Sequence, residues 1–285
     1  MFAIRNLAGR TAGHRLGASV MAALVLLAAF GGIRADDPPA DAAKQKKAPD
    51  SATQDRPPAP SSARPAKPDG GELPIPVAKS WIRVAKGYPI WVDLKKKEVI
   101  VKGRVAIQRG QLEMFACPKG TKEHESVVAV ESPAKFVHLA LLAVGARPGK
   151  PVSFDPKYRP ASGTPIQIDV VWKDGKGKVH RDRAQEWVRN ARTGKPLKYD
   201  WVFGGSNFWT DETTGERYYA AEGGELVCVS NFSTATLDLP VESTAANQGL
   251  VYVANDKKVP PRGTPVVMIL RPKPKPDEAT KKKSK

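Results

Sequence analysis

The segment that most restricts how this chain can fold is residues 36–74, DDPPADAAKQKKAPDSATQDRPPAPSSARPAKPDGGELP. Proline, alanine, serine, lysine and aspartate dominate it, and large apolar side chains are nearly absent. Such a segment cannot bury enough apolar surface to offset the conformational entropy that folding removes. We therefore expect a disordered linker that its prolines hold extended.

The carboxyl end has the same character. Residues 273–285, KPKPDEATKKKSK, contain six lysines and two acidic residues. We expect a disordered basic tail here. The two polar segments leave residues 75–272 for folded structure, which is an ordinary size for one globular domain.

The amino terminus has the pattern of a secretory signal peptide. Arg5, Arg10 and Arg15 precede an apolar run at residues 16–33, and Ala35 precedes an acidic, proline-rich stretch. This order predicts a signal peptide at residues 1–35 and a periplasmic or secreted mature protein. An uncleaved membrane anchor is the alternative, because a span needs about 17–25 residues. No later segment is apolar enough to cross a membrane, so we expect no transmembrane span in the mature chain.

The charge is high, with 46 Lys and Arg against 29 Asp and Glu. Within the expected domain the basic residues are mixed with acidic ones, whereas nucleic-acid readers gather basic and aromatic residues on one face. We therefore expect no nucleic-acid partner. The basic tail leaves open an attraction to anionic polymers or lipids of the cell envelope.

The apolar pattern of the domain has mostly a period of two, which is typical of β-strands. Residues 89–94 and 98–107 read as a hairpin, and residues 112–117 and 126–131 as two further strands. The remaining strand candidates lie in residues 164–188, 201–206, 217–232 and 265–270.

One segment departs from this period. Ser132 as N-cap, Pro133 at the first helical position and Gly145 as the stop predict a helix that is apolar on nearly every face. A second short helix is expected within residues 241–250. The predicted fold class is α+β and β-rich, with antiparallel or mixed sheets and one buried helix near residues 133–144.

Several stretches of the domain resemble the YdjY-domain family of exported bacterial proteins. They include GQLEMFACPKGTKEHESVVAV, AQEWVRNARTGKPL, DWVFGGSNFW and ELVCVSNFSTATLDLPVES, in the family's order, and the resemblance covers roughly residues 85–271. It implies an exported domain with these limits and names no activity. A ferredoxin-type description given to some members would imply a four-iron cluster. Such a cluster needs four thiolates or close equivalents, and this chain has two cysteines.

The stretch EMFACPKGTKEHES, residues 113–126, concentrates the chemically interesting side chains. Cysteines in an oxidising compartment usually pair, which makes a disulfide between Cys117 and Cys228 a candidate, with two buried free thiols as the alternative. A metal site is a second candidate, with zinc as the metal. Its spacing matches no standard zinc signature, and we expect no cofactor otherwise. The candidate ligands are Glu113, Cys117, His124, Glu125 and His138.

Nucleophilic catalysis by Cys117 is disfavoured. Pro118 has no N–H to donate to an oxyanion, and no helix starts after the thiol to lower its pKa. We therefore assign no catalytic residue. The stretch TDETTG, residues 210–215, lacks the spacing of a calcium loop and reads as a hairpin turn.

Aromatic residues crowd one third of the domain and form a candidate binding shelf for a sugar or peptide. A β core filled by large side chains is the alternative. We expect a non-catalytic, exported module that binds or assembles with an unknown partner or polymer of the envelope. The rival function is metal binding or thiol redox chemistry on the Cys117–His124 loop. The candidate shelf residues are Trp187, Trp201, Phe208, Trp209 and Tyr218.

Overall fold

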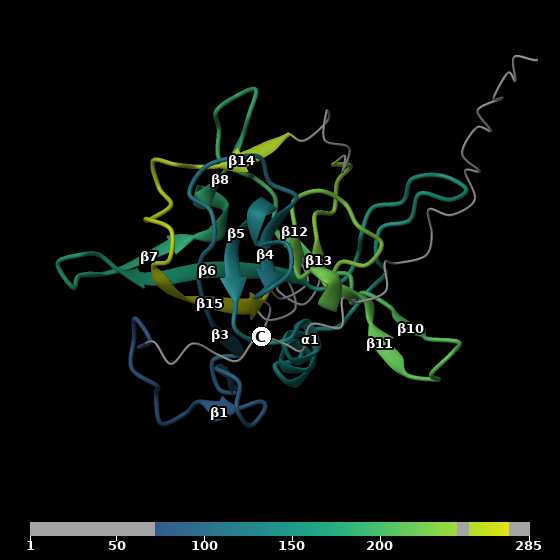
Figure 1. Cartoon of the computed structure of the whole chain (residues 1–285), viewed down its shortest axis with the longest axis horizontal. Helices are drawn as coiled ribbons and strands as arrows, with labels where there is room; N and C mark the ends of the chain where they lie inside the picture. The colour runs from purple at the N-terminus through teal and green to yellow at the C-terminus, as the bar shows by residue number, and fades with distance from the viewer. Residues whose placement is uncertain (1–71, 244–250, 274–285) are drawn as a thin grey trace, which may run out of the picture. The chain divides into compact units, whose positions relative to one another are not determined.

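A computed structural model describes residues 72–243 and 251–273. These residues form a β-rich domain with one α-helix (Figure 1). The expected signal peptide, nearly all of the linker and of the basic tail, and most of the expected second helix lie outside the described residues.

Eight strands form a closed, mixed barrel. Neighbouring strands are antiparallel except for the parallel pairs β12–β13 and β4–β5. The β-rich α+β class is therefore confirmed, while the expected antiparallel or mixed sheets are corrected to one closed barrel. In order around the barrel the strands are β3 (Glu98–Val105), β15 (Pro265–Pro272), β6 (Pro165–Lys173), β9 (Trp201–Phe203), β13 (Leu237–Asp238), β12 (Val227–Cys228), β4 (Met114–Pro118) and β5 (Ser126–Val130), which returns to β3.

Closure depends on β3, because one edge of this strand serves two partners. Its first half pairs with β2 (Ile90–Asp93), which confirms the predicted hairpin, and its second half pairs with β5. At the changeover, the Lys102 N–H donates to the Pro89 carbonyl, and the Lys102 carbonyl accepts from the Glu131 N–H. The Lys102 ammonium lies 3.2 Å from the Glu131 carboxylate, and both side chains are buried.

Gly103 lets β5 approach β3 this closely. A Cβ atom added at Gly103 would stand 2.6 Å from the Ala129 carbonyl oxygen and 3.0 Å from a methyl carbon of Val128. A backbone oxygen in a paired strand has little freedom to move away, so a side chain here would force β5 to shift away from β3.

The main core fills the barrel interior and continues under the helix. Val99 and Val101 of β3 face this core, while Ile100 between them faces outward. The outward face is covered by Leu73, Ile75 and Trp81 from the start of the described chain. Both faces of this part of the sheet are therefore buried.

Helix α1 (Ala134–Ala143) forms close to its predicted position and packs on β2 and β3. Only one face is buried, because Leu139 and Leu142 are 52% and 41% exposed. The expected buried helix is therefore buried on one side, where the barrel covers it, and no described element covers the other side as fully.

The start of α1 differs from the sequence prediction, whereas its end agrees with it. Ser132 does not cap the helix; the Glu222 carboxylate instead accepts the N–H groups of Ala134 and Lys135, at 3.0 and 2.9 Å. Gly145 ends the helix as predicted, with a φ of +87° in the left-handed region that glycine adopts most readily.

Several short strands and 3₁₀ helices lie outside the eight barrel strands. Strand β1 pairs with β2, β7 with β6, β8 with β14, and β10 with β11 as a separate two-stranded hairpin. Their bounds are β1 (Ile82–Arg83), β7 (Val179–Arg183), β8 (Val188–Asn190), β10 (Phe208–Thr210), β11 (Arg217–Tyr219) and β14 (Tyr252–Ala254), with 3₁₀ helices η1 (Glu123–Glu125), η2 (Ala184–Trp187) and η3 (Ala220–Gly223).

Replacing Gly103 with alanine tests the closure. We expect Gly103→Ala to lower the free energy of unfolding by about 1–3 kcal/mol, because β5 must shift away from the added methyl group. Gly175→Ala is the matched control, since no atom lies within 4 Å of the added Cβ there. Denaturant unfolding measures both variants. Equal stability of the two would contradict the closure described here.

Candidate functional site

The loop that carries the candidate ligands joins two parallel strands. Met114 lies opposite Ser126 and Pro118 opposite Val130, so β4 and β5 run in the same direction. Residues 119–125 carry the chain back to the start of β4. Gly120 permits the return with a φ of +86°.

A lysine stands at the centre of the acidic residues of this loop. The Lys122 ammonium lies 3.1 Å from Glu225, 3.6 Å from Glu113 and 3.7 Å from Glu125. It also lies 4.8 Å above the ring of Phe232. Burial opposes its charge, but these carboxylates, Glu225 most strongly, outweigh burial and raise the pKa of Lys122.

Glu113 has a raised pKa, because its carboxyl is buried and lies beside Glu125. The Lys122 ammonium occupies the position among these carboxylates that a metal cation would take. The cluster therefore ties the loop, by ion pairing, to Glu113 directly before β4 and to Glu225 shortly before β12.

The two histidines lie in different surroundings. His124 has a side chain that is 78% exposed and lies 3.8 Å from Glu125. His138, on α1, places its Nδ1 atom 2.9 Å from the Tyr219 hydroxyl and packs against the ring of Phe203. Burial lowers the pKa of His138. Within residues 72–243 and 251–273, no three His, Cys, Asp or Glu side chains are grouped so that they could hold a metal ion.

The two cysteines are buried, free and not near each other. The candidate disulfide is therefore not formed in this structure, which has the alternative of two buried free thiols. The strands β4 and β12 are neighbours, but Cys228 lies opposite Met114 rather than Cys117. Burial raises the pKa of Cys117 to about 11 and that of Cys228 well above its usual value.

A buried carboxyl that the sequence did not single out lies on β13. Asp238 is fully buried and accepts the N–H groups of Leu239, Asn231 and Phe232, at 2.7, 3.0 and 3.2 Å. Burial raises the pKa of Asp238 to about 7, although these hydrogen bonds act in the opposite direction. The Asn231 side chain in turn accepts the Ser243 N–H, so the carboxyl anchors residues 231–243.

The predicted aromatic shelf divides into two groups. Trp187 and Trp201 are fully buried in the main core. Their indole N–H groups donate to Asp182 and to the Cys228 carbonyl. These two side chains belong to the structure of the barrel and not to a surface.

The other three shelf residues lie on the β10–β11 hairpin. Trp209 and Tyr218 are cross-strand partners whose rings stack at 4.9 Å, and Phe208 is 52% exposed. None of the three belongs to the hydrophobic clusters of the described core. Tyr219 joins the hairpin to the barrel, through its hydroxyl contacts with His138 and Thr236. We call residues 207–219 the aromatic hairpin.

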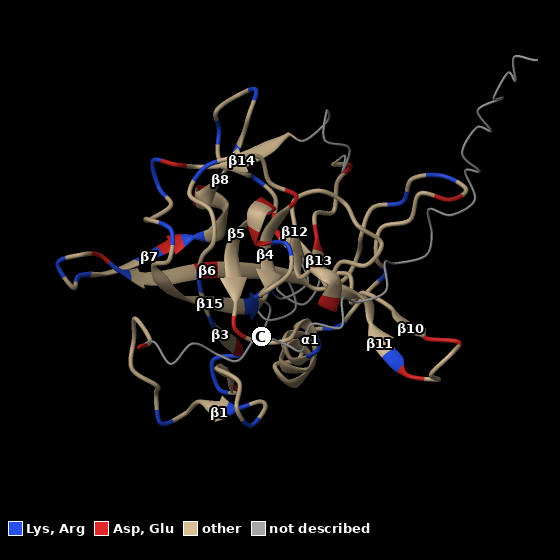
Figure 2. Ribbon diagram, viewed as in Figure 1, with Lys and Arg blue, Asp and Glu red and all other residues tan. Residues whose placement is uncertain are grey.

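The far end of the aromatic hairpin is acidic. Asp211 forms the turn by accepting the N–H groups of Thr213 and Thr214, which confirms the predicted hairpin turn. Glu212 is exposed, and Glu216 accepts the Tyr218 hydroxyl. Figure 2 shows acidic residues at this turn and a basic residue on β11, where Arg217 lies over the Phe208 ring.

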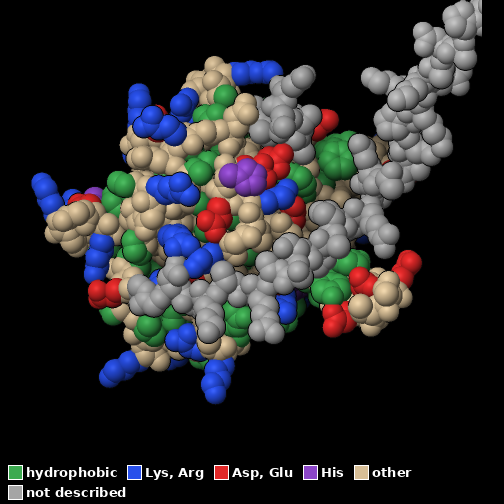
Figure 3. Space-filling model, in the orientation of Figure 1, with side chains coloured by type: hydrophobic (Ala, Val, Ile, Leu, Met, Phe, Trp, Pro, Cys, Tyr) green, Lys and Arg blue, Asp and Glu red, His purple; other side chains and the backbone are tan. Residues whose placement is uncertain are grey.

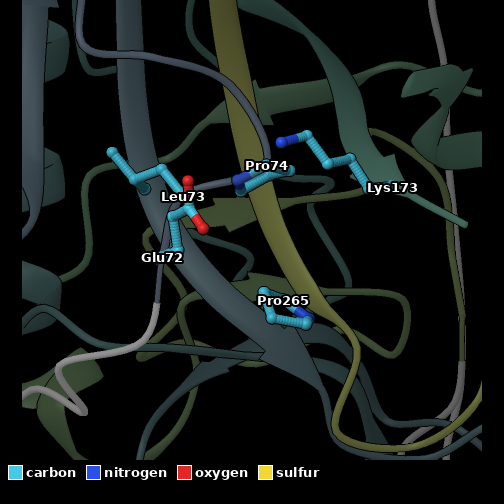
Figure 4. Close-up of a pocket in the computed structure, with 5 residues that line it drawn as sticks. All are labelled: Glu72, Leu73, Pro74, Lys173 and Pro265. Atoms are coloured by element: carbon cyan, nitrogen blue, oxygen red, sulfur yellow. The ribbon is translucent and has the colours of Figure 1, made fainter. Parts of the chain in front are cut away.

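Elsewhere the visible surface is mixed in charge. In Figure 3 the Lys and Arg side chains are scattered, while hydrophobic and acidic side chains lie together where the hairpin projects. Figure 4 shows a pocket of about 170 Å³, lined by Glu72, Leu73, Pro74, Lys173 and Pro265. Ligand pockets enclose about 300–1,000 Å³, so this one fits little more than a small fragment.

Comparison with known proteins gives one match. A family model described as the YdjY domain matches residues 90–271. No curated protein and no solved structure matches. In the described part of the chain, no helix is long and apolar enough to cross a membrane.

Thiol chemistry tests the arrangement of the cysteines. We expect the folded, unreduced protein to react very slowly with a thiol reagent at pH 8, because both thiols are buried and protonated. In denaturant, still without reductant, both should react. A denatured, unreduced protein with no reactive thiol would show that the two cysteines are bonded after all.

Asp238 predicts a dependence of stability on pH. Its folded-state pKa is higher than that of an unfolded aspartate, so the folded state binds the proton more tightly. The free energy of unfolding should therefore fall as the pH rises from about 4 to about 7, by up to about 1.4 kcal/mol per pH unit.

Denaturant unfolding of the wild type and of Asp238→Asn between pH 4 and pH 8 isolates this effect, because the other titrating groups cancel in the difference. The variant also loses acceptors for its three N–H donors, so only the change of the difference with pH is informative. A difference that is constant, or that changes in favour of the wild type with rising pH, would contradict the raised pKa.

Proposed function

The chain belongs to the YdjY-domain family, and from that premise we propose that it is an exported, non-catalytic module that binds a partner or polymer of the cell envelope. The aromatic hairpin is the binding element. The observation that carries the proposal is the Trp209–Tyr218 stack with the neighbouring exposed Phe208, outside the core.

The hairpin has the physical properties of a recognition surface. A two-stranded hairpin alone is only marginally stable in water, and the Tyr219 hydroxyl attaches this one to the barrel through His138 and Thr236. Aromatic side chains that only supported the fold would be buried, as Trp187 and Trp201 are. Tryptophan and tyrosine also dominate the energetics of protein interfaces.

The rest of the domain supports a binding role by surface contact. The barrel interior is filled by core side chains, and the drawn pocket is small. The candidate ligands are dispersed: Lys122 occupies the acidic cluster, His124 faces solvent and His138 packs under the hairpin. The raised pKa values of both cysteines disfavour the thiolate that redox chemistry needs.

Export is part of the proposal and is supported by the residues at positions 1–35. The basic start, the apolar run and Ala35 match a signal peptide. The proline-rich residues 36–74 would then place the barrel at a distance from the site of cleavage or attachment.

Alanine substitutions on the hairpin test the proposal. Phe208→Ala and Trp209→Ala should reduce retention in isolated cell envelopes by at least about fivefold, because truncation of an aromatic side chain at the centre of an interface costs more than about 1 kcal/mol of binding. Co-sedimentation of the purified full chain with envelopes measures it.

Phe154→Ala is the matched control, because Phe154 is also an exposed phenylalanine, 57% accessible, and lies outside the hairpin. It should behave as the wild type. The proposal is wrong if the hairpin variants co-sediment as strongly as Phe154→Ala, or if cell fractionation finds the protein in the cytoplasm.

A further inference from the structure

We propose that the aromatic hairpin accepts a basic, proline-containing peptide, and that the chain's own residues 274–285 are its resident occupant. The inference rests on the proposed function, because it takes the hairpin as the binding element, and it names the chemical class that the hairpin prefers. Any envelope partner would then compete with this tail.

The charge of the hairpin carries the first part of the argument. The chain as a whole has a formal net charge of +17, yet the turn of the hairpin places Asp211, Glu212 and Glu216 within a few residues. These carboxylates lie on the same hairpin as the exposed Phe208 and the half-buried Trp209–Tyr218 stack, and Arg217 over the Phe208 ring shows that this surface accepts a cation; the arrangement attracts ammonium groups by ion pairing and by cation–π contact. A basic ligand fits this surface better than a neutral or acidic one.

The sequence of the tail is complementary. Pro274 and Pro276 come first, and Lys281, Lys282 and Lys283 follow. Proline rings stack on aromatic side chains, and proline-rich peptides lose little entropy when they bind in the extended polyproline form. The lysines supply positive charge, opposite to that of the carboxylates at the hairpin turn.

The end of the described chain also points to this occupant. Lys273 donates its N–H to the Pro165 carbonyl at 2.8 Å, and Pro165 pairs with Val202 of β9. The chain leaves the barrel beside the strand that leads into the hairpin. Lys273 also forms an ion pair with Asp200, directly before β9.

The tail is long enough to span the distance from Lys273 to Phe208. From Val202 to Phe208 the chain extends at most about 22 Å, and two cross-strand steps of about 5 Å bring the separation from Lys273 to at most about 32 Å. Residues 274–285 in polyproline form extend about 37 Å. The tail therefore reaches Phe208, on the first strand of the hairpin, within one molecule, where its effective concentration is in the millimolar range.

Charge reversal in the full chain tests the inference without removing any folded part. We replace Lys281, Lys282 and Lys283 with glutamate and follow Trp209 by fluorine NMR of 5-fluorotryptophan-labelled protein, with its resonance assigned from Trp209→Phe. The Trp209 resonance should shift in the charge-reversed chain, and high salt should move the wild-type resonance toward the same position.

Two matched variants make the result specific. Lys176→Glu with Lys178→Glu reverses two exposed lysines in the β6–β7 turn and should leave the Trp209 resonance in place. Glu212→Lys should shift the resonance as the tail reversal does. Combining Glu212→Lys with the reversed tail should restore the wild-type position, because the charges are again opposite.

The inference is overturned if the Trp209 resonance is the same with the wild-type and the reversed tail. A shift that depends on protein concentration would overturn docking within one molecule and assign the tail to a second copy. Envelope retention of the same variants separates the two proposals. Loss of retention in Phe208→Ala, with no response of Trp209 to tail reversal, would leave the proposed function standing and remove only this inference.

Discussion

The fold depends on the closure of the barrel at β3, where one strand edge pairs with β2 and then with β5. Gly103 makes the second pairing possible, because the Ala129 carbonyl occupies the space of a side chain. The buried Lys102–Glu131 ion pair lies at the same point. Breaking a buried pair by removing one partner leaves an uncompensated charge, which costs several kcal/mol, so closure and ion pair support each other.

Closure of the barrel also leaves no room for a ligand in its interior. A closed eight-stranded barrel has an interior that side chains just fill, and here it contains the main core, including Trp187 and Trp201. The loop at residues 119–125 is fixed between two parallel strands by the ion pairs of Lys122. On the described surface, the aromatic hairpin brings large aromatic rings and acidic charge together, and for this reason we propose it as the binding element.

Local pattern predicted the elements better than their arrangement. The period of two located β2, β3 and the β6–β7 pair, and Gly145 located the end of α1, because these signals act within a few residues. The parallel pairing of β4 with β5 and the separation of Cys117 from Cys228 depend on contacts between distant segments, which alternation does not contain. Composition likewise grouped Trp187 with Trp209, although packing against the barrel buries the first and leaves the second outside the core. Asp238 gave no signal, since its burial follows from the loop that folds over it.

The most direct test of a surface-binding role is amide hydrogen exchange of the full chain with and without isolated cell envelopes. This measurement reports every segment at once, so it does not presuppose the site. The account predicts slower exchange at residues 207–219 when envelopes are present, with barrel strands such as β3 and β6 unchanged. Protection confined to residues 119–125, with the hairpin unaffected, would contradict it and return the function to the loop of Cys117 and His124.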